Sequence, residues 1–187
     1  MFFAYNIGME EKKRRACRIV WQIVLSLLCV ASVAWIFSNS LTPAEQSAEQ
    51  SAGATDALLK IIRIFYPDVS SLTEEQYEKI HSVIRVLAHF AEFAYLGAMF
   101  VWCWRAYSQN RAWLALPCGG VLLIPIVDEL LQSFTDGRAM EWKDLAIDWV
   151  GGMVGGAFAL GVLAFIAWIK IKRGKRNGKG ELGNSTC

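Results

Sequence analysis

The sequence predicts an all-α polytopic membrane protein, built as a four-helix transmembrane bundle with short extracytoplasmic helices between the first and second spans. Of the 187 residues, 55% are hydrophobic and only 19% are charged, whereas about 25% of the residues in soluble domains are charged. The apolar residues gather in runs near the ~20 residues that a membrane-spanning helix needs. Basic residues flank these runs, which is typical of membrane proteins.

The apolar runs divide the chain into three regions. We expect a basic cytoplasmic N-terminus at residues 1–18, a four-span membrane domain at 19–169 and a basic cytoplasmic tail at 170–187. The expected spans cover about residues 19–37, 84–104, 112–134 and 146–169, with an outer loop at 38–83. The third run is the least regular, because its continuous part at 112–127 reaches only about 24 Å as a helix and needs the following turn.

The orientation follows from the distribution of charge. With both termini in the cytoplasm, 13 of the 19 lysines and arginines lie on the inner side and 14 of the 17 acids lie on the outer side or in the outer halves of the spans. The positive-inside rule predicts this topology. A cleaved signal peptide is the alternative for the first run, but its 19 apolar residues exceed the usual 7 to 15. A net charge of only +2 argues against nucleic acid as a partner.

The outer loop carries signals for two helices. A broad apolar stripe over residues 58–65, interrupted by Lys60 and Arg63, predicts a helix on the outer leaflet or capping the bundle. The sequence from Thr73 to Gln76 has the pattern of a capping box, so a helix is expected to start there and continue into the second span. The alternative is a solvated loop with transient helicity.

The second and third spans carry polar side chains that lipid disfavours. Arg85, His89 and Glu92 follow helical spacing and share one face of the outer half of the second span. Such residues normally face the bundle interior and find a partner, so the alternative to a functional site is a structural pair of Glu92 with Arg85 or His89. In the third span Asp128 and Gln132 share a face, and Glu129 lies about 100° away.

The turn after the third span contains a glycine followed by Arg138. Its guanidinium is a planar, permanently charged fork that suits a carboxylate or phosphate. The alternative is that Arg138 only neutralises Asp128 or Glu129. The fourth span then enters through Asp144 and Asp148 and continues into two overlapping pairs of small residues. Gly151, Gly152, Gly155 and Gly156 favour close packing inside the bundle over homodimerisation, which stays an alternative.

These polar residues are expected to converge at the outer membrane boundary and to bind a ligand there. The predicted ligand-binding residues are Asn39, Arg85, His89, Glu92, Asp128, Glu129, Gln132, Arg138, Asp144 and Asp148. No comparable cluster is expected on the cytoplasmic face. The sequence has no established metal motif, so we expect no metal and no cofactor, although a divalent ion held by Asp128, Glu129, Asp148 and His89 is an alternative.

The order of these motifs resembles the VanZ-like family of small bacterial membrane proteins, named after an accessory protein associated with teicoplanin resistance. The resemblance covers residues 36–156 and is carried by Phe37-Ser38-Asn39-Ser40, His89-x-x-Glu92-Phe93, Asp128-Glu129-x-x-Gln132-x-Phe134-x-x-Gly137-Arg138, Asp144 and Gly152. Two positions depart from the family pattern: Asp136 stands where proline is common, and Asp148 where asparagine is common. The resemblance implies the bacterial cytoplasmic membrane and a role in the envelope or in glycopeptide resistance.

Three functions compete. The first is a contribution to glycopeptide or lipoglycopeptide resistance, through an outer polar site that engages a surface lipid, a lipid-linked cell-wall precursor or the drug. The second is an enzyme acting on a lipid-linked envelope substrate, with His89, Glu129 or Asp128 as catalytic candidates and Arg138 clamping the head group. The third is a small proton-coupled transporter, although the inner halves of the spans contain almost no ionisable residues.

Overall fold

The computed structural model describes residues 2–66, 72–108 and 110–183, and for residues 2–10, 111, 112 and 175–183 it describes the backbone alone. The described elements are α1 (Phe2–Ser40), α2 (Ala44–Phe65), α3 (Glu74–Tyr107), the 3-10 helix η2 (Arg111–Leu114), α4 (Ala115–Ser133) and α5 (Trp142–Gly183). Four segments are long and apolar enough to cross a membrane: Glu11–Ser40, Glu74–Tyr107, Ala115–Ser133 and Trp142–Gly174. The predicted all-α, four-span membrane bundle is therefore confirmed.

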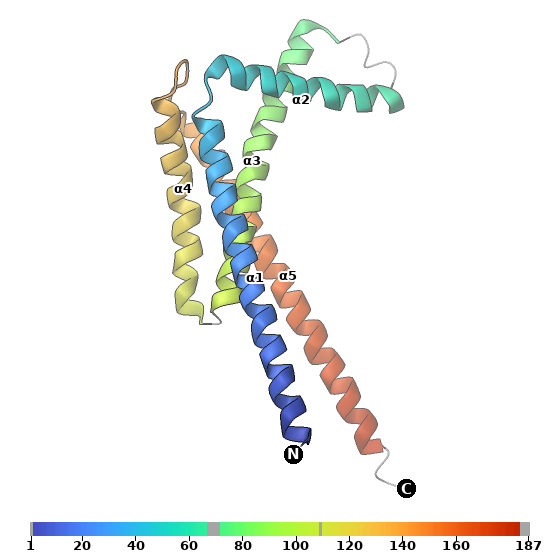
Figure 1. The fold of residues 1–187 in the computed structure, drawn as a ribbon. Coiled ribbons are helices and arrows are strands. Elements are labelled where there is room, and N and C mark those ends of the chain that lie inside the picture. Colours follow the sequence, from blue (N-terminus) through green and yellow to red (C-terminus); the bar gives the residue numbers. More distant parts are fainter. Residues whose placement is uncertain (1, 67–71, 109, 184–187) are drawn as a thin grey trace.

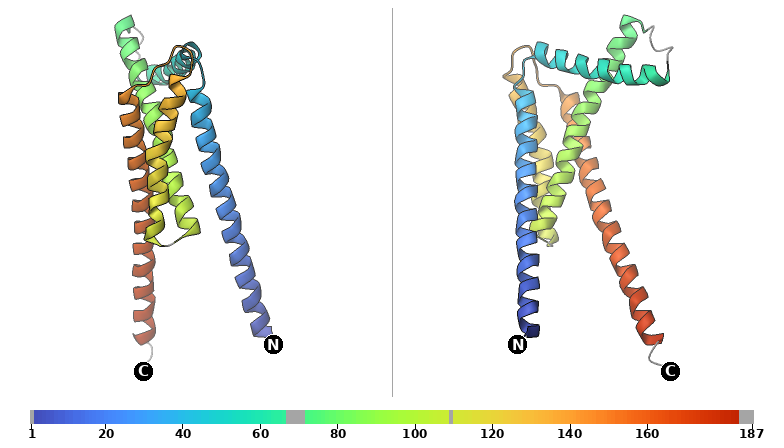
Figure 2. Two further views of the ribbon diagram at one scale, coloured as in Figure 1. Left: turned by 90° about the vertical axis from the view of Figure 1, so that its left-hand side faces the viewer. Right: turned by 45° about the vertical axis from the view of Figure 1, so that its right-hand side comes forward.

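The four long helices run side by side, and α2 lies across one end of them (Figure 1). We call this the α2 end, and we call the opposite end, where both termini lie, the terminal end. Figure 2 shows that α1 and α5 diverge toward the terminal end. The bundle is therefore tightest near α2 and opens toward the termini.

Several helices extend beyond the apolar runs that predicted them. The helix α5 begins at Trp142 and continues to Gly183, because lysine and arginine are good helix formers and a helix need not end at the membrane boundary. The helix α3 begins at Glu74, where the predicted capping box is confirmed. The Gln76 N–H donates to the Thr73 hydroxyl at 3.3 Å, and the Thr73 N–H donates to the Gln76 side chain at 3.0 Å.

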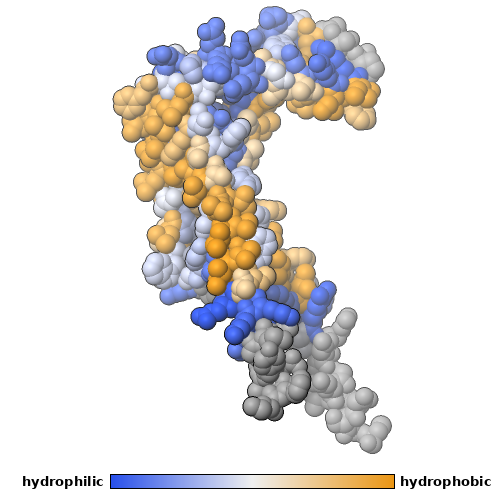
Figure 3. All heavy atoms as spheres, in the orientation of Figure 1, coloured by the Kyte–Doolittle hydropathy of each residue, from blue (hydrophilic) through white to orange (hydrophobic). Residues whose placement is uncertain are grey.

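The helix α2 is longer than the short helices expected in the outer loop, with 22 residues. Leu59 is buried, whereas Ile61, Ile64 and Phe65 on the same apolar stripe are exposed. Figure 3 shows hydrophobic side chains on the side of α2 that faces the terminal end and hydrophilic ones on the opposite side. This arrangement is typical of a helix that rests on the surface of a membrane.

The closest packing in the bundle is between α3 and α5. A Cβ added at Gly151 would lie 2.6 Å from the carbonyl oxygen of Phe90, and one added at Gly155 would overlap the carbonyl oxygen of Ala94. Only glycine permits this approach of two backbones. The glycine face of α5 thus packs inside the bundle, against α3 and, at Gly152, also against Val121 of α4.

Apolar side chains cover much of the outer surface, as expected for contact with lipid. Examples are Leu27, Val30 and Phe158, with exposed fractions above one half. Among the described residues the cysteines are free: Cys29 is buried, whereas Cys17 and Cys118 are exposed, because apolar runs in a membrane protein supply an outer surface as well as a core.

Candidate functional site

Three acidic side chains and one amide are almost completely buried near the α2 end. Asp128 is 1% exposed, Glu129 0%, Asp148 0% and Gln132 2%. They therefore face the bundle interior, which is where ionisable residues of a span are tolerated. The predicted site residues on α1, α3, α4 and α5 lie at the same end of the bundle, but they contact different partners.

Asp128 is held by two side-chain donors. The Ser40 hydroxyl, at the end of α1, donates to one carboxylate oxygen, and the amide of Gln132, one turn along α4, donates to the other at 2.8 Å. Ser40 is itself only 2% exposed. The carboxylate of Asp128 therefore links α1 to α4, and both of its oxygens accept hydrogen bonds from side chains other than Arg138.

Glu129 interacts with the start of α5. One of its carboxylate oxygens accepts the N–H of Glu141 at 2.9 Å, immediately before α5 begins at Trp142. The first N–H groups of a helix lack intrahelical partners and attract negative charge. The second carboxylate oxygen of Glu129 is buried without a hydrogen bond. Glu129 thus positions the entry of α5 beside the end of α4.

The polar residues of α3 have partners that the sequence did not indicate. Glu92 accepts hydrogen bonds from the Asn39 amide at 3.0 Å and from the Trp35 indole at 3.3 Å. His89 faces Asp148 of α5, with 3.7 Å between Nδ1 and Oδ1. The structural pair of Glu92 with Arg85 or His89 is therefore not the observed arrangement.

The turn from α4 to α5 is fixed by contacts to the other chain segments at the α2 end. The Thr135 hydroxyl lies 3.0 Å from the Ser40 carbonyl oxygen, and the Ala44 N–H donates to the Asp136 carbonyl at 3.2 Å. Gly137 has a φ of +74°, a left-handed conformation that favours glycine. These contacts set the direction of the next residue, Arg138.

Arg138 is half-buried, and its Nε atom is buried without a hydrogen bond. In the described part of the chain it makes no contact ion pair with Asp128 or Glu129, so any neutralisation of these carboxylates acts over a longer distance. Burial and the like charge of Arg85 lower the pKa of Arg138, while Asp128, Glu129 and Asp144 act in the opposite direction. Two arginine side chains thus lie near each other at the α2 end, with three carboxylates close enough to act on their charge.

A polar cavity of about 110 Å³ opens between these two arginines. Its lining residues are Ala44, Ser47, Arg85, Gln132, Gly137, Arg138, Ala139, Glu141 and Asp144. Four of the predicted ligand-binding residues line this cavity, namely Arg85, Gln132, Arg138 and Asp144. The other predicted residues, Asn39, His89, Glu92, Asp128, Glu129 and Asp148, do not line it.

Sequence reasoning did not place Trp35, Ser47 or Glu141 in the site. It named Ser40 only as part of the Phe37-Ser38-Asn39-Ser40 motif and gave it no role, although that motif was an available signal. Glu141 contributes a backbone N–H, which no residue type can reveal.

As for the metal alternative, the described residues contain no group of three His, Cys, Asp or Glu side chains arranged to hold an ion.

Comparisons with known proteins give one result. A family model described as VanZ/LLP1 matches residues 23–168, more than half of the chain. Comparisons with curated proteins and with solved structures found no match. The matched range contains every predicted ligand-binding residue and every residue that lines the polar cavity.

Proposed function

The chain belongs to the VanZ/LLP1 family, and we propose that it is a bacterial envelope protein that binds a phosphate-bearing lipid head group at the α2 end. By occupying or withdrawing that lipid, or a lipid-linked cell-wall precursor, it lowers susceptibility to teicoplanin-type lipoglycopeptides. The drug class comes from the family resemblance, and the ligand class comes from the polar cavity.

The proposal places the α2 end outside the cell. Thirteen of the 19 basic residues lie at the terminal end, at the end of α3 or in the short connection between α3 and α4. The positive-inside rule puts this side in the cytoplasm. In that orientation the protein sits in the bacterial cytoplasmic membrane with both termini inside, and α2 rests on the outer leaflet, where lipid-linked precursors and the drug are found.

The observation that carries the proposal is the unpaired Arg138 beside Arg85. A guanidinium whose Nε is buried without an acceptor lacks a hydrogen bond that a phosphate oxygen would supply. An anion between the two arginines would also offset the burial and the repulsion by Arg85 that together lower the pKa of Arg138. The carboxylates of Asp144 and Glu141 on the same cavity would accept hydrogen bonds from an amine or hydroxyl of the head group.

The size of the cavity favours a lipid head group over the whole drug. A volume of about 110 Å³ holds only a few waters at about 30 Å³ each, and pockets that enclose a drug-sized ligand begin near 300 Å³. A phosphate group fits such a space while the apolar part of the ligand remains in the membrane. A glycopeptide would have to stay outside.

The structure gives the other two functions less support. An enzyme needs its proton-transfer group within reach of the bound substrate, but His89, Asp128 and Glu129 do not line the cavity. A transporter needs a polar path, whereas the buried cluster of Ile36, Phe93 and Leu96 lies within the bundle between its ends.

Drug susceptibility tests the proposal. Wild type, Arg138→Gln and the matched control Arg63→Gln are expressed at equal membrane levels in a sensitive Gram-positive host. Arg63 is an exposed arginine of α2 that does not line the cavity. Loss of a charged hydrogen-bond partner costs about 1.5 to 3 kcal/mol, or roughly 10- to 150-fold in head-group affinity. We expect wild type and Arg63→Gln to raise tolerance to teicoplanin more than to vancomycin, and Arg138→Gln to abolish the rise. Equal tolerance with Arg138→Gln would contradict the proposal.

A further inference from the structure

A large open groove lies at the terminal end, at the opposite end of the bundle from the polar cavity. It has a volume of about 1090 Å³ and is lined by α1, the end of α3 and α5. The groove arises because α1 and α5 diverge there (Figure 2). The sequence predicts no polar cluster at this end, where the basic residues are sufficiently explained as a topology signal.

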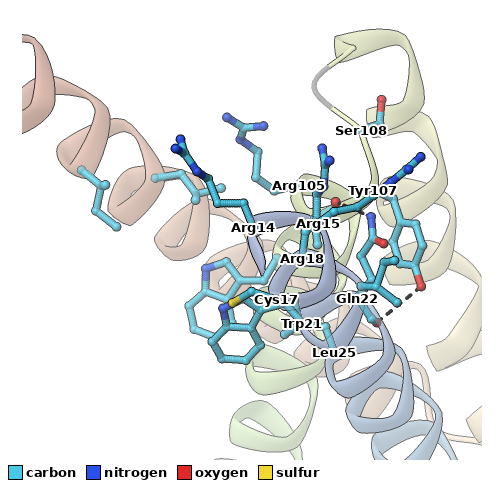
Figure 4. Close-up of a pocket in the computed structure, with 15 residues that line it drawn as sticks. Arg14, Arg15, Cys17, Arg18, Trp21, Gln22, Leu25, Arg105, Tyr107 and Ser108 are labelled. Atoms are coloured by element: carbon cyan, nitrogen blue, oxygen red, sulfur yellow. Dashed lines mark hydrogen bonds between the residues drawn. The ribbon is translucent and has the colours of Figure 1, made fainter. Parts of the chain in front are cut away.

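The mouth of the groove is strongly basic. Arg14, Arg15 and Arg18 of α1 and Arg105 of α3 line it, and no acidic residue is among the lining residues that the structure describes. Figure 4 shows the arginines of α1 near Arg105, with Gln22 and Tyr107 beside them. Arginine presents a planar fork of donors that binds phosphate oxygens in pairs.

The remainder of the groove is apolar. Trp21 and Leu25 continue along α1 from the arginines, and Leu163 and Ile166 of α5 lie on the other side. From Arg14 to Leu25 is about 16 Å along a helix at about 1.5 Å per residue. This distance is about half of a hydrocarbon core ~30 Å thick. Along α1 the groove therefore extends over about the thickness of one membrane leaflet, with its arginines at the membrane surface.

Polar contacts fix one wall of the groove. The Gln22 amide donates to the Ala106 carbonyl at 2.9 Å, and the Tyr107 and Ser26 hydroxyls are 2.9 Å apart. These contacts join α1 to the end of α3 just below the arginines. The α1–α3 wall is thus held in place while the side toward α5 stays open to lipid.

We propose that this groove binds one molecule of an anionic phospholipid of the surrounding leaflet, with its phosphate at the four arginines and an acyl chain between α1 and α5. The site is separate from the polar cavity and does not depend on it. General attraction of basic residues to an anionic membrane would need neither the groove nor its apolar lining. A bound lipid needs both, so the two situations can be separated by experiment.

The test is a titration of the purified full chain in detergent micelles with phosphatidylglycerol or phosphatidylcholine, counting bound lipids by native mass spectrometry. Arg85→Gln and Arg138→Gln are present throughout, so that the cavity at the α2 end does not contribute. The test variant is Arg14→Gln/Arg18→Gln/Arg105→Gln. The matched control, Lys170→Gln/Lys172→Gln/Arg173→Gln, removes the same charge from α5 outside the groove.

We expect one saturable phosphatidylglycerol site, with phosphatidylcholine bound at least ten times more weakly. Each arginine contributes about fivefold, so the test variant should lose roughly 100-fold in affinity and the control less than fivefold. Leu163→Trp, which fills the apolar part without a change of charge, should also weaken lipid binding. Equal losses in the two triple variants would overturn the proposal, as would a site that takes inorganic phosphate but shows no preference between the lipids.

Discussion

Replacing Gly151 with alanine tests how closely α3 packs against α5. The added Cβ would lie 2.6 Å from the carbonyl oxygen of Phe90, and an ordinary contact is at least 3.4 Å, so the two helices must separate by about 0.8 Å. Overpacking of this kind costs about 1 to 3 kcal/mol. The higher helix propensity of alanine offsets little of this cost, because a transmembrane segment stays helical when the bundle comes apart.

The free energy of unfolding is measured by titrating the protein in mixed micelles with a denaturing detergent and following tryptophan fluorescence. The control is Gly161→Ala, since no atom lies within 4 Å of a Cβ at that position. We expect Gly151→Ala to lower the free energy by about 1 to 3 kcal/mol and Gly161→Ala to change it by less than about 0.5 kcal/mol. Equal values for the two variants would refute the close contact.

Two further substitutions concern the α2 end. Gly137→Ala should destabilise the protein by about 1 to 2 kcal/mol in the same titration, because the φ of +74° is unfavourable for alanine; Gly53→Ala, on an open helical surface, should not. Ser40→Ala removes a buried donor to Asp128 and should cost about 1 to 3 kcal/mol, whereas Ser133→Ala, at an exposed hydroxyl, should cost almost nothing. A Ser40→Ala protein as stable as wild type would show that Asp128 does not need this donor.

The sequence predicted the features that depend on local pattern. Membrane spans follow from the length of apolar runs, and the capping box at Thr73 follows from residues three positions apart, so neither requires knowledge of the fold. The length of α2 was underestimated because its first half, from Ala44 to Gly53, has no regular apolar stripe. Alanine, glutamate and glutamine are good helix formers, and that signal was available.

The partners within the site required the three-dimensional structure. Ser40 and Asp128 are 88 residues apart, and their contact depends on how α1 lies against α4. The sequence likewise placed Asp128 and Glu129 beside Arg138, but each carboxylate has other donors and leaves the arginine unpaired. The groove at the terminal end depends on the divergence of two helices, which no charge pattern encodes.

Capture of the ligand at the polar cavity tests the central claim most directly. A photoreactive amino acid replaces Ala139, an exposed residue that lines the cavity, and intact cells are irradiated. A second protein carries the photoreactive residue at Ala54, an exposed position of α2 outside the cavity. We predict that Ala139, and not Ala54, crosslinks to a lipid with a phosphate-bearing head group, identified by mass spectrometry, and that Arg85→Gln/Arg138→Gln abolishes the product. The same lipid captured equally at both positions, or capture that survives loss of both arginines, would contradict the account.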